Sequence, residues 1–203
     1  MVHAIIRPPR ARYSLEQLGP ANFTFLGQRF RRDDVELLSS NVATNTPVDG
    51  EKNLEGGATP TCSFLKLQAS IWTRVPQNEN SPSPYSPTRP GLNHEGNDEE
   101  DEGTTKSDNN SKSTKPKTKH TMIVYLHGNA SARVEVVPNL SFLLAQVGVF
   151  GVVGLDFTGS GRSDGDWVSL GYYERVDLEC LLQHLKHVYG GPDGTDLEII
   201  LWG

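Results

Sequence analysis

The sequence HTMIVYLHGNA occupies residues 120–130, and in it an apolar run stops abruptly at a His-Gly-Asn turn. Two similar runs follow: residues 149–156 lead into the glycine-rich sequence FTGSGRSDG (157–165), and residues 197–202 read LEIILW. Short apolar runs without alternation are typical of parallel strands that are covered on both faces. Strands separated by helical stretches indicate a parallel α/β sheet whose loops gather at one edge. We therefore expect β-α-β-α-β order here.

The two stretches between these runs have helical spacing. In the first, the apolar residues are Val137, Leu140, Leu143, Leu144 and Val147, and Gly148 follows them at the position of a C-terminal cap. In the second, which extends from about Gly171 to Val188, the apolar stripe consists of Leu178, Leu181, Leu182, Leu185 and Tyr189. Both patterns predict a helix with one buried face.

An antiparallel pair of strands is expected before this unit. Residues 25–39 alternate partially and residues 64–75 alternate more regularly, so each predicts a strand. No helical pattern separates the two, which favours antiparallel pairing. Residues 1–24 contain a basic, proline-containing sequence and are expected to form an extended N-terminal arm that lies on the domain.

Residues 77–119 have a different composition from the rest of the chain. Tyr85 and Leu92 are their only sizeable apolar residues, and five consecutive acids occupy positions 98–102. Such a segment buries too little apolar surface to offset an ordering cost of about 1–2 kcal/mol per residue. We expect a disordered low-complexity insertion that interrupts a single domain over residues 25–203. It could serve as a solvated spacer or as a regulatory segment.

The chain has 203 residues, two cysteines and a formal net charge of -6, and this charge argues against nucleic acid as a partner. No apolar run reaches the roughly 18 residues of a membrane-spanning helix, and no secretory signal follows Met1. Cys62 and Cys180 form no disulfide framework and are expected to stay reduced. These features predict an intracellular, cytoplasmic protein.

Nucleotide and metal motifs match poorly. Gly159, Gly161 and Gly165 give G-x-G-x-x-x-G rather than G-x-G-x-x-G, and they do not follow the first strand of the unit. The chain contains no Gly-Lys-Ser/Thr sequence, which a P-loop requires. His184 and His187 share a helix face without a third ligand nearby, and the remaining histidines are scattered. We expect neither a cofactor nor a metal.

Residues 120–203 resemble the α/β-hydrolase superfamily, within the lineage of serine aminopeptidases and acyl-peptidase-like serine hydrolases. The resemblance is carried by VYLHGN (124–129), DFTGSGRSDG (156–165), SLGYYE (169–174) and the strand that ends in Trp202-Gly203. It implies a partial α/β-hydrolase fold, in which antiparallel strands precede the parallel set. It also implies an N-terminal portion that ends just before the turn carrying the nucleophile.

In such enzymes the serine lies in a G-x-S-x-G turn, and two backbone N–H groups hold the oxyanion. The resemblance makes the N–H of Asn129 one of these donors, and Gly128 would let the backbone turn close to the substrate. A plain strand-end turn is the alternative. Asp156, Ser163 and Asp164 are expected to be structural. Gly161-Arg-Ser163-Asp-Gly165 has the letters of G-x-S-x-G, but it follows a loop rather than a strand end.

The function that the resemblance implies is hydrolysis of an ester or peptide-type acyl bond in a small molecule or peptide. The nucleophile, acid and histidine are expected outside these residues, so we expect residues 1–203 to be inactive and prone to aggregation when isolated. The alternative is a non-catalytic hydrolase-like remnant or interaction protein, whose protein partners the sequence does not identify. A serine two residues beyond Gly203, followed by a glycine two residues later, would favour the enzyme.

Overall fold

The computed structural model describes residues 9–42, 64–76 and 119–203. The expected insertion at 77–119 therefore lies outside the described residues except for Lys119. In chain order the elements are η1 (Leu15–Leu18), β1 (Asn22–Phe25), β2 (Gln28–Val42), β3 (Phe64–Val75), β4 (His120–Tyr125), η2 (Arg133–Val136), α2 (Val137–Leu144), β5 (Val149–Asp156), α3 (Tyr172–Tyr189) and β6 (Leu197–Trp202).

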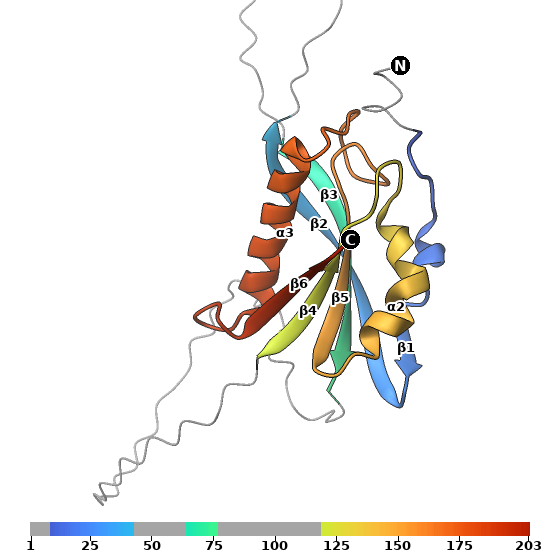
Figure 1. Cartoon of the computed structure of the whole chain (residues 1–203), viewed down its shortest axis with the longest axis vertical. Helices are drawn as coiled ribbons and strands as arrows, with labels where there is room; N and C mark the ends of the chain where they lie inside the picture. Colours follow the sequence, from blue (N-terminus) through green and yellow to red (C-terminus); the bar gives the residue numbers. More distant parts are fainter. Residues whose placement is uncertain (1–8, 43–63, 77–118) are drawn as a thin grey trace, which may run out of the picture.

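Within the described residues, six strands form one mixed sheet in the order β1-β2-β3-β5-β4-β6 (Figure 1). The pairs β1–β2, β2–β3 and β3–β5 are antiparallel, whereas β4 runs parallel to both β5 and β6. The predicted α/β fold class is confirmed, with antiparallel strands followed by parallel β-α-β-α-β order. The order also brings β4 and β5 side by side, so the loops after these two strands emerge at the same edge.

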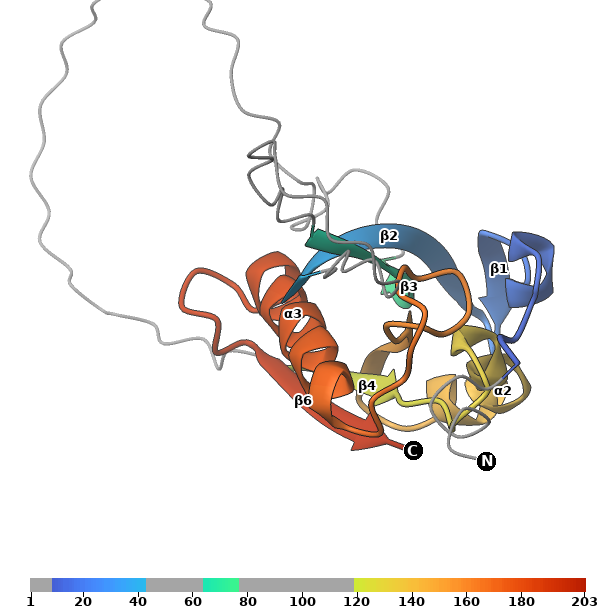
Figure 2. The same ribbon diagram turned by 90° about the horizontal axis from the view of Figure 1, so that it is seen from above.

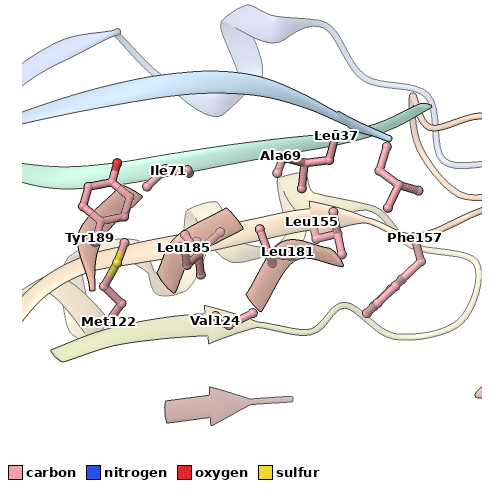
Figure 3. Packing of buried hydrophobic residues seen from close by; sticks show 12 residues of the cluster. Leu37, Ala69, Ile71, Met122, Val124, Leu155, Phe157, Leu181, Leu185 and Tyr189 are labelled. Carbon is pink, nitrogen blue, oxygen red and sulfur yellow. The ribbon is translucent and has the colours of Figure 1, made fainter. Parts of the chain in front are cut away.

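Helices cover both faces of the sheet, with α3 on one side and α2 on the other (Figures 1 and 2). Alternate residues of β4 divide between two cores: Met122 and Val124 pack in the cluster that contains α3, while Ile123 and Tyr125 pack in the cluster that contains α2. Figure 3 shows side chains of α3 packed against those of the strands in the first cluster. This double burial explains why β4 lacks the polar alternation of a half-exposed strand.

The predicted strand over residues 25–39 is wrong at its start. The structure has a hairpin there, in which Phe25 pairs with Gln28 across Leu26 and Gly27. Both turn residues have positive φ, 49° and 72°, as a type I′ turn requires. Leucine is an unusual residue at the first of these positions, so the sequence carried no recognisable turn signal.

The first predicted helix is shorter than the apolar pattern that predicted it, which runs from Val137 to Val147. It ends at Leu144, and a 3-10 turn, η2, precedes it. Val147, which the pattern placed on the buried face, is fully exposed, while Leu143 and Leu144 are buried. The helical spacing of apolar residues in the sequence therefore extends to Val147, three residues beyond the end of the helix. The second helix was predicted to begin at about Gly171, and Gly171 is its N-cap.

The N-terminus of α3 is held by the Glu174 carboxylate. It accepts hydrogen bonds from the N–H groups of Ser169 and Gly171, each at 2.8 Å, and Ser169 Oγ in turn accepts the N–H of Tyr173 at 2.6 Å. Partial burial raises the pKa of Glu174, but the hydrogen bonds from Ser169 and Gly171 outweigh it and hold the pKa below its usual value. The carboxylate satisfies N–H groups that a helix start leaves without partners.

Glu174→Ala is expected to lower the free energy of unfolding by about 1 kcal/mol, the typical value of a helix cap. Urea unfolding followed by circular dichroism would measure the change. Arg175→Ala, at the next and exposed position, is the control and should stay within about 0.5 kcal/mol of wild type. Equal losses in the two variants would contradict a capping role for Glu174.

The outer strand β6 exposes apolar side chains. Ile200, Leu201 and Trp202 keep between 44% and 50% of their surface accessible, and the Trp202 ring lies 6.0 Å from that of Phe142 on α2. Among the described helices, none combines the length and the apolar character needed to cross a membrane.

Candidate functional site

The turn formed by residues 127–131 follows β4, and the loop formed by residues 157–165, here called the glycine loop, follows β5. Because β4 and β5 are parallel neighbours, with Tyr125 opposite Gly154, the two connections meet at one edge of the sheet. The Phe157 N–H donates to His127 Nε2 at 3.3 Å, and the two rings are 5.1 Å apart. His127 Nδ1 lies 2.8 Å from the Gly128 carbonyl oxygen, to which it can donate as the neutral tautomer. His127 therefore joins the 127–131 turn to the glycine loop.

The 127–131 turn is tightly folded and exposed at its centre. The Ser131 N–H donates to the Gly128 carbonyl at 3.2 Å, and Ala130 has a left-handed φ of 61°. The Asn129 side chain closes the turn locally, because its Oδ1 accepts the Ala130 N–H at 2.9 Å. This is a short-range bond of the kind that asparagine makes in turns.

The two predicted site residues differ in what their N–H groups do. The Gly128 N–H donates to Glu135 Oε2 at 3.2 Å, so it is already engaged. The Asn129 N–H makes no hydrogen bond to any residue that the structure describes, and Asn129 is exposed. A backbone N–H in this position is available to an external acceptor.

The role predicted for Gly128 finds no steric support within the described residues. A Cβ added at this position would meet no atom within 4 Å, and its backbone is not in the left-handed region. Nothing among the described residues requires glycine here.

Glu135, in η2, connects the turn to the sheet. Its Oε1 accepts the Tyr125 hydroxyl at 3.2 Å, while Oε2 holds the Gly128 N–H. Partial burial raises the pKa of Glu135, but a hydrogen bond from the Ser131 side chain and that from Gly128 outweigh it, so the pKa lies below its usual value. For Tyr125, burial and the neighbouring Glu135 charge raise the pKa of the hydroxyl. Glu135 is thus ionised at neutral pH.

The glycine loop makes structural contacts, as expected. Ser163 is buried; its hydroxyl donates to the Asp156 carbonyl at 2.5 Å and accepts the Gln68 N–H at 2.9 Å. Asp164 accepts the Lys66 N–H at 2.9 Å and returns its own N–H to the Lys66 carbonyl. These bonds extend the pairing of β3 beyond the end of β5. A serine hydroxyl engaged in this way is not presented to a substrate.

Asp156 organises this edge of the sheet. Its carboxylate is fully buried and accepts the N–H of Arg133 at 2.7 Å, the N–H of Arg162 at 2.9 Å and the hydroxyl of Tyr13. The Arg133 guanidinium is also buried, with Nε 3.8 Å from Asp156 Oδ2 and its centre 5.8 Å from the Tyr13 ring centroid. One carboxylate therefore joins η2, the glycine loop and residues 9–20, here called the N-terminal segment.

The contacts of Tyr13 were not predicted from the sequence. Burial, followed by the hydrogen bond to Asp156, raises the pKa of the Tyr13 hydroxyl above its usual value. On the same segment, Arg10 donates to the carbonyl oxygens of Ser163 and Gly165. The segment lies beside α2 and β1 in both views (Figures 1 and 2). An aromatic residue in a basic stretch gave no sign that it would contact a loop so distant in sequence.

Gly161 is a position in the glycine loop at which only glycine fits. Its φ is +48°, and an added Cβ would lie 2.4 Å from the carboxyl carbon of Asp156. A side chain there would combine left-handed strain with a clash against the buried carboxylate.

The histidine pair on α3 lies on the part of the chain that the structure describes. Burial, followed by the neighbouring His187, lowers the pKa of His184. Within the described parts of the chain, no group of three or more histidine, cysteine or acidic residues is placed to hold a metal ion.

No protein-family model matches the chain, and no curated protein sequence matches it. Among solved structures, it is similar to the Pyrococcus furiosus esterase Pf2001 in space group P212121, with 17% identity, a TM-score of 0.49, and coverage of 98% of this chain and 48% of that one. The same esterase in space group P21 gives 18% identity, a TM-score of 0.47, and coverage of 96% and 48%. The chain spans about half the length of the esterase structures that it matches.

Proposed function

We propose that this chain is part of a serine hydrolase of the α/β-hydrolase type that cleaves an ester or peptide-type acyl bond. The single observation that carries the proposal is the Asn129 N–H, which is exposed at the carboxyl end of β4 and has no partner among the described residues. The carboxyl ends of strands are where open α/β sheets bind their ligands. The resemblance of residues 120–203 to the superfamily gives this N–H its role.

In the proposed reaction, a serine hydroxyl attacks the acyl carbon and charge develops on the carbonyl oxygen. The Asn129 N–H donates to this oxygen, and a second donor follows the nucleophile. Removing one such donor typically lowers kcat by about 10²–10³-fold. Ser163 is engaged with Asp156 and Gln68 and is not our candidate nucleophile. We propose that the nucleophile, the acid and the histidine belong to further residues of a full-length polypeptide, as the resemblance implies.

A fluorophosphonate probe tests this proposal, because it reacts covalently with an activated serine. We expect the full-length polypeptide to be labelled and to hydrolyse p-nitrophenyl butyrate or an aminoacyl p-nitroanilide. We expect a chain limited to residues 1–203 to be inactive. A correctly folded full-length protein that neither reacts with the probe nor hydrolyses either substrate would favour a non-catalytic interaction protein.

Asn129→Pro and Asn129→Ala form a matched pair for the oxyanion donor. Proline removes the N–H, so we expect kcat of the full-length protein to fall by about 10²-fold or more. Alanine keeps the N–H and removes only the side-chain bond to Ala130, so kcat should stay within about threefold of wild type. Ester hydrolysis, with circular dichroism to verify folding, measures both. Equal losses in the two variants would show that the Asn129 side chain, and not its N–H, is required.

A further inference from the structure

We propose that Glu135 is the positioning residue of the oxyanion turn: its carboxylate fixes the Gly128 N–H and thereby leaves the Asn129 N–H directed to the substrate. This inference rests on the proposed function, because it concerns the same turn. It assigns to Glu135 a task that neither the motif in residues 124–129 nor the resemblance contains.

The carboxylate bridges a rigid element and a short turn. One oxygen accepts the hydroxyl of Tyr125, whose side chain is buried at the end of β4, and the other accepts the Gly128 N–H; both distances are 3.2 Å. Asn139 of α2 contacts the same hydroxyl at 3.4 Å. The turn is therefore tied, through one side chain, to the packed strand and helix behind it.

Glu135 is itself held in place. Its N–H donates to the Ala132 carbonyl at 2.9 Å, and two residues earlier the Arg133 N–H donates to the buried Asp156 at 2.7 Å. A site residue carried on a fixed element can hold its partner in one geometry. The consequence for the turn is selective: the Gly128 N–H is engaged, and the adjacent Asn129 N–H is not.

Glu135 acts through the turn and not on the reacting atoms. A negative charge beside the forming oxyanion would oppose it, so the carboxylate contributes as a hydrogen-bond acceptor only. This predicts that glutamine, which is uncharged and has the same shape, can replace it: its carbonyl oxygen accepts the Gly128 N–H, and its amide nitrogen donates to the Tyr125 hydroxyl oxygen. Leucine, of similar size without an acceptor, cannot.

Protonation of Glu135 provides a second test of its hydrogen bond to the Gly128 N–H. Its pKa lies below the ordinary value of 4.5, and the groups that face it are Tyr125 from β4 and Ser131 and His127 from the turn. For a depressed pKa, the bond to the Gly128 N–H is present above that pKa and weakens as the pH falls through it. The Gly128 amide proton should therefore titrate below pH 4.5 in wild type and lose this titration in Glu135→Gln.

The experiment combines amide NMR and kinetics on the full-length protein. In Glu135→Leu we expect the resonance of the Gly128 amide proton to shift upfield, as it does when a hydrogen bond is lost. We also expect kcat to fall about 10²-fold while KM stays within twofold of wild type, as for a misplaced catalytic group. In Glu135→Gln we expect kcat within about threefold of wild type. Tyr125→Phe removes the anchor but keeps the carboxylate, so an intermediate loss is expected.

The readouts separate failure of this inference from failure of the proposed function. A wild-type protein that lacks hydrolase activity would contradict the proposed function. The pH dependence of the Gly128 amide proton resonance would still test whether Glu135 holds the Gly128 N–H. An unchanged Gly128 amide in Glu135→Leu overturns the inference. So does an unchanged kcat in that variant, or a loss in Glu135→Gln as large as in Glu135→Leu. If Glu135→Leu fails to fold, the comparison of Glu135→Gln with Tyr125→Phe decides, and equal activity of these two with wild type overturns it.

Discussion

Replacing Asp156 by alanine is expected to lower the free energy of unfolding by about 3–5 kcal/mol, the usual cost of removing one partner from a buried ion pair. The carboxylate is fully buried, and its loss would leave the Arg133 guanidinium buried without its acidic partner. The N–H groups of Arg133 and Arg162 and the Tyr13 hydroxyl would lose their acceptor together. Urea unfolding of the protein, followed by intrinsic fluorescence and circular dichroism, measures the change.

Two control variants separate the parts of this effect. Tyr13→Phe removes one hydrogen bond to the carboxylate and should cost about 1.5–3 kcal/mol at most. Combining Asp156→Ala with Arg133→Met removes both charges, and we expect the double variant to be more stable than Asp156→Ala alone. A loss below about 1 kcal/mol in Asp156→Ala would contradict the role given to this carboxylate.

Asp177→Ala is expected to cost about 3 kcal/mol or more, because it removes the charged acceptor of three buried hydrogen bonds, and a hydrogen bond to a charged group contributes about 1.5–3 kcal/mol. Asp177 lies on the buried face of α3. Its carboxylate accepts the hydroxyl of Ser39 at 2.8 Å, and the N–H and hydroxyl of Thr158 at 2.8 and 3.0 Å. It therefore joins α3 to β2 and to the start of the glycine loop.

Glu179→Ala is the matched control for Asp177→Ala. This residue lies on the same helix but is exposed, so its replacement should change the free energy of unfolding by less than about 0.5 kcal/mol. Thermal melting of both variants beside wild type makes the comparison. Similar melting temperatures for the Asp177 and Glu179 variants would refute the structural role of Asp177.

The apolar framework of the fold could be predicted from the sequence. The run at residues 149–156 coincides with β5, and the run at residues 64–75 coincides with β3. Period-two and uninterrupted apolar patterns report burial directly, which is why these elements were found. Element ends were less predictable: Val147 continues a helical period, yet the chain has already left the helix. Local turn geometry decides such ends, and periodicity does not contain it.

The polar contacts of the site were beyond prediction for a different reason. Gly128 and Asn129 were predicted as site residues from the resemblance, whereas Glu135 is, by sequence, an ordinary acid near the start of a helix. The role proposed for Glu135 depends on where Tyr125 places its hydroxyl, and that position depends on the packing of β4 against α2. Tyr13 is a stronger case, since its partner belongs to a strand far along the chain. Residue type alone does not encode such distant pairings.

The bond between Tyr13 and Asp156 sets an order of events while the protein is being made. The two residues are 143 positions apart, so at about 5–20 residues per second the ribosome needs roughly 7–30 s between them. Throughout this interval the Tyr13 hydroxyl lacks the Asp156 carboxylate, and Arg133, once made, lacks it for 23 further residues. The contact between the N-terminal segment and Asp156 therefore cannot form until β5 has been made.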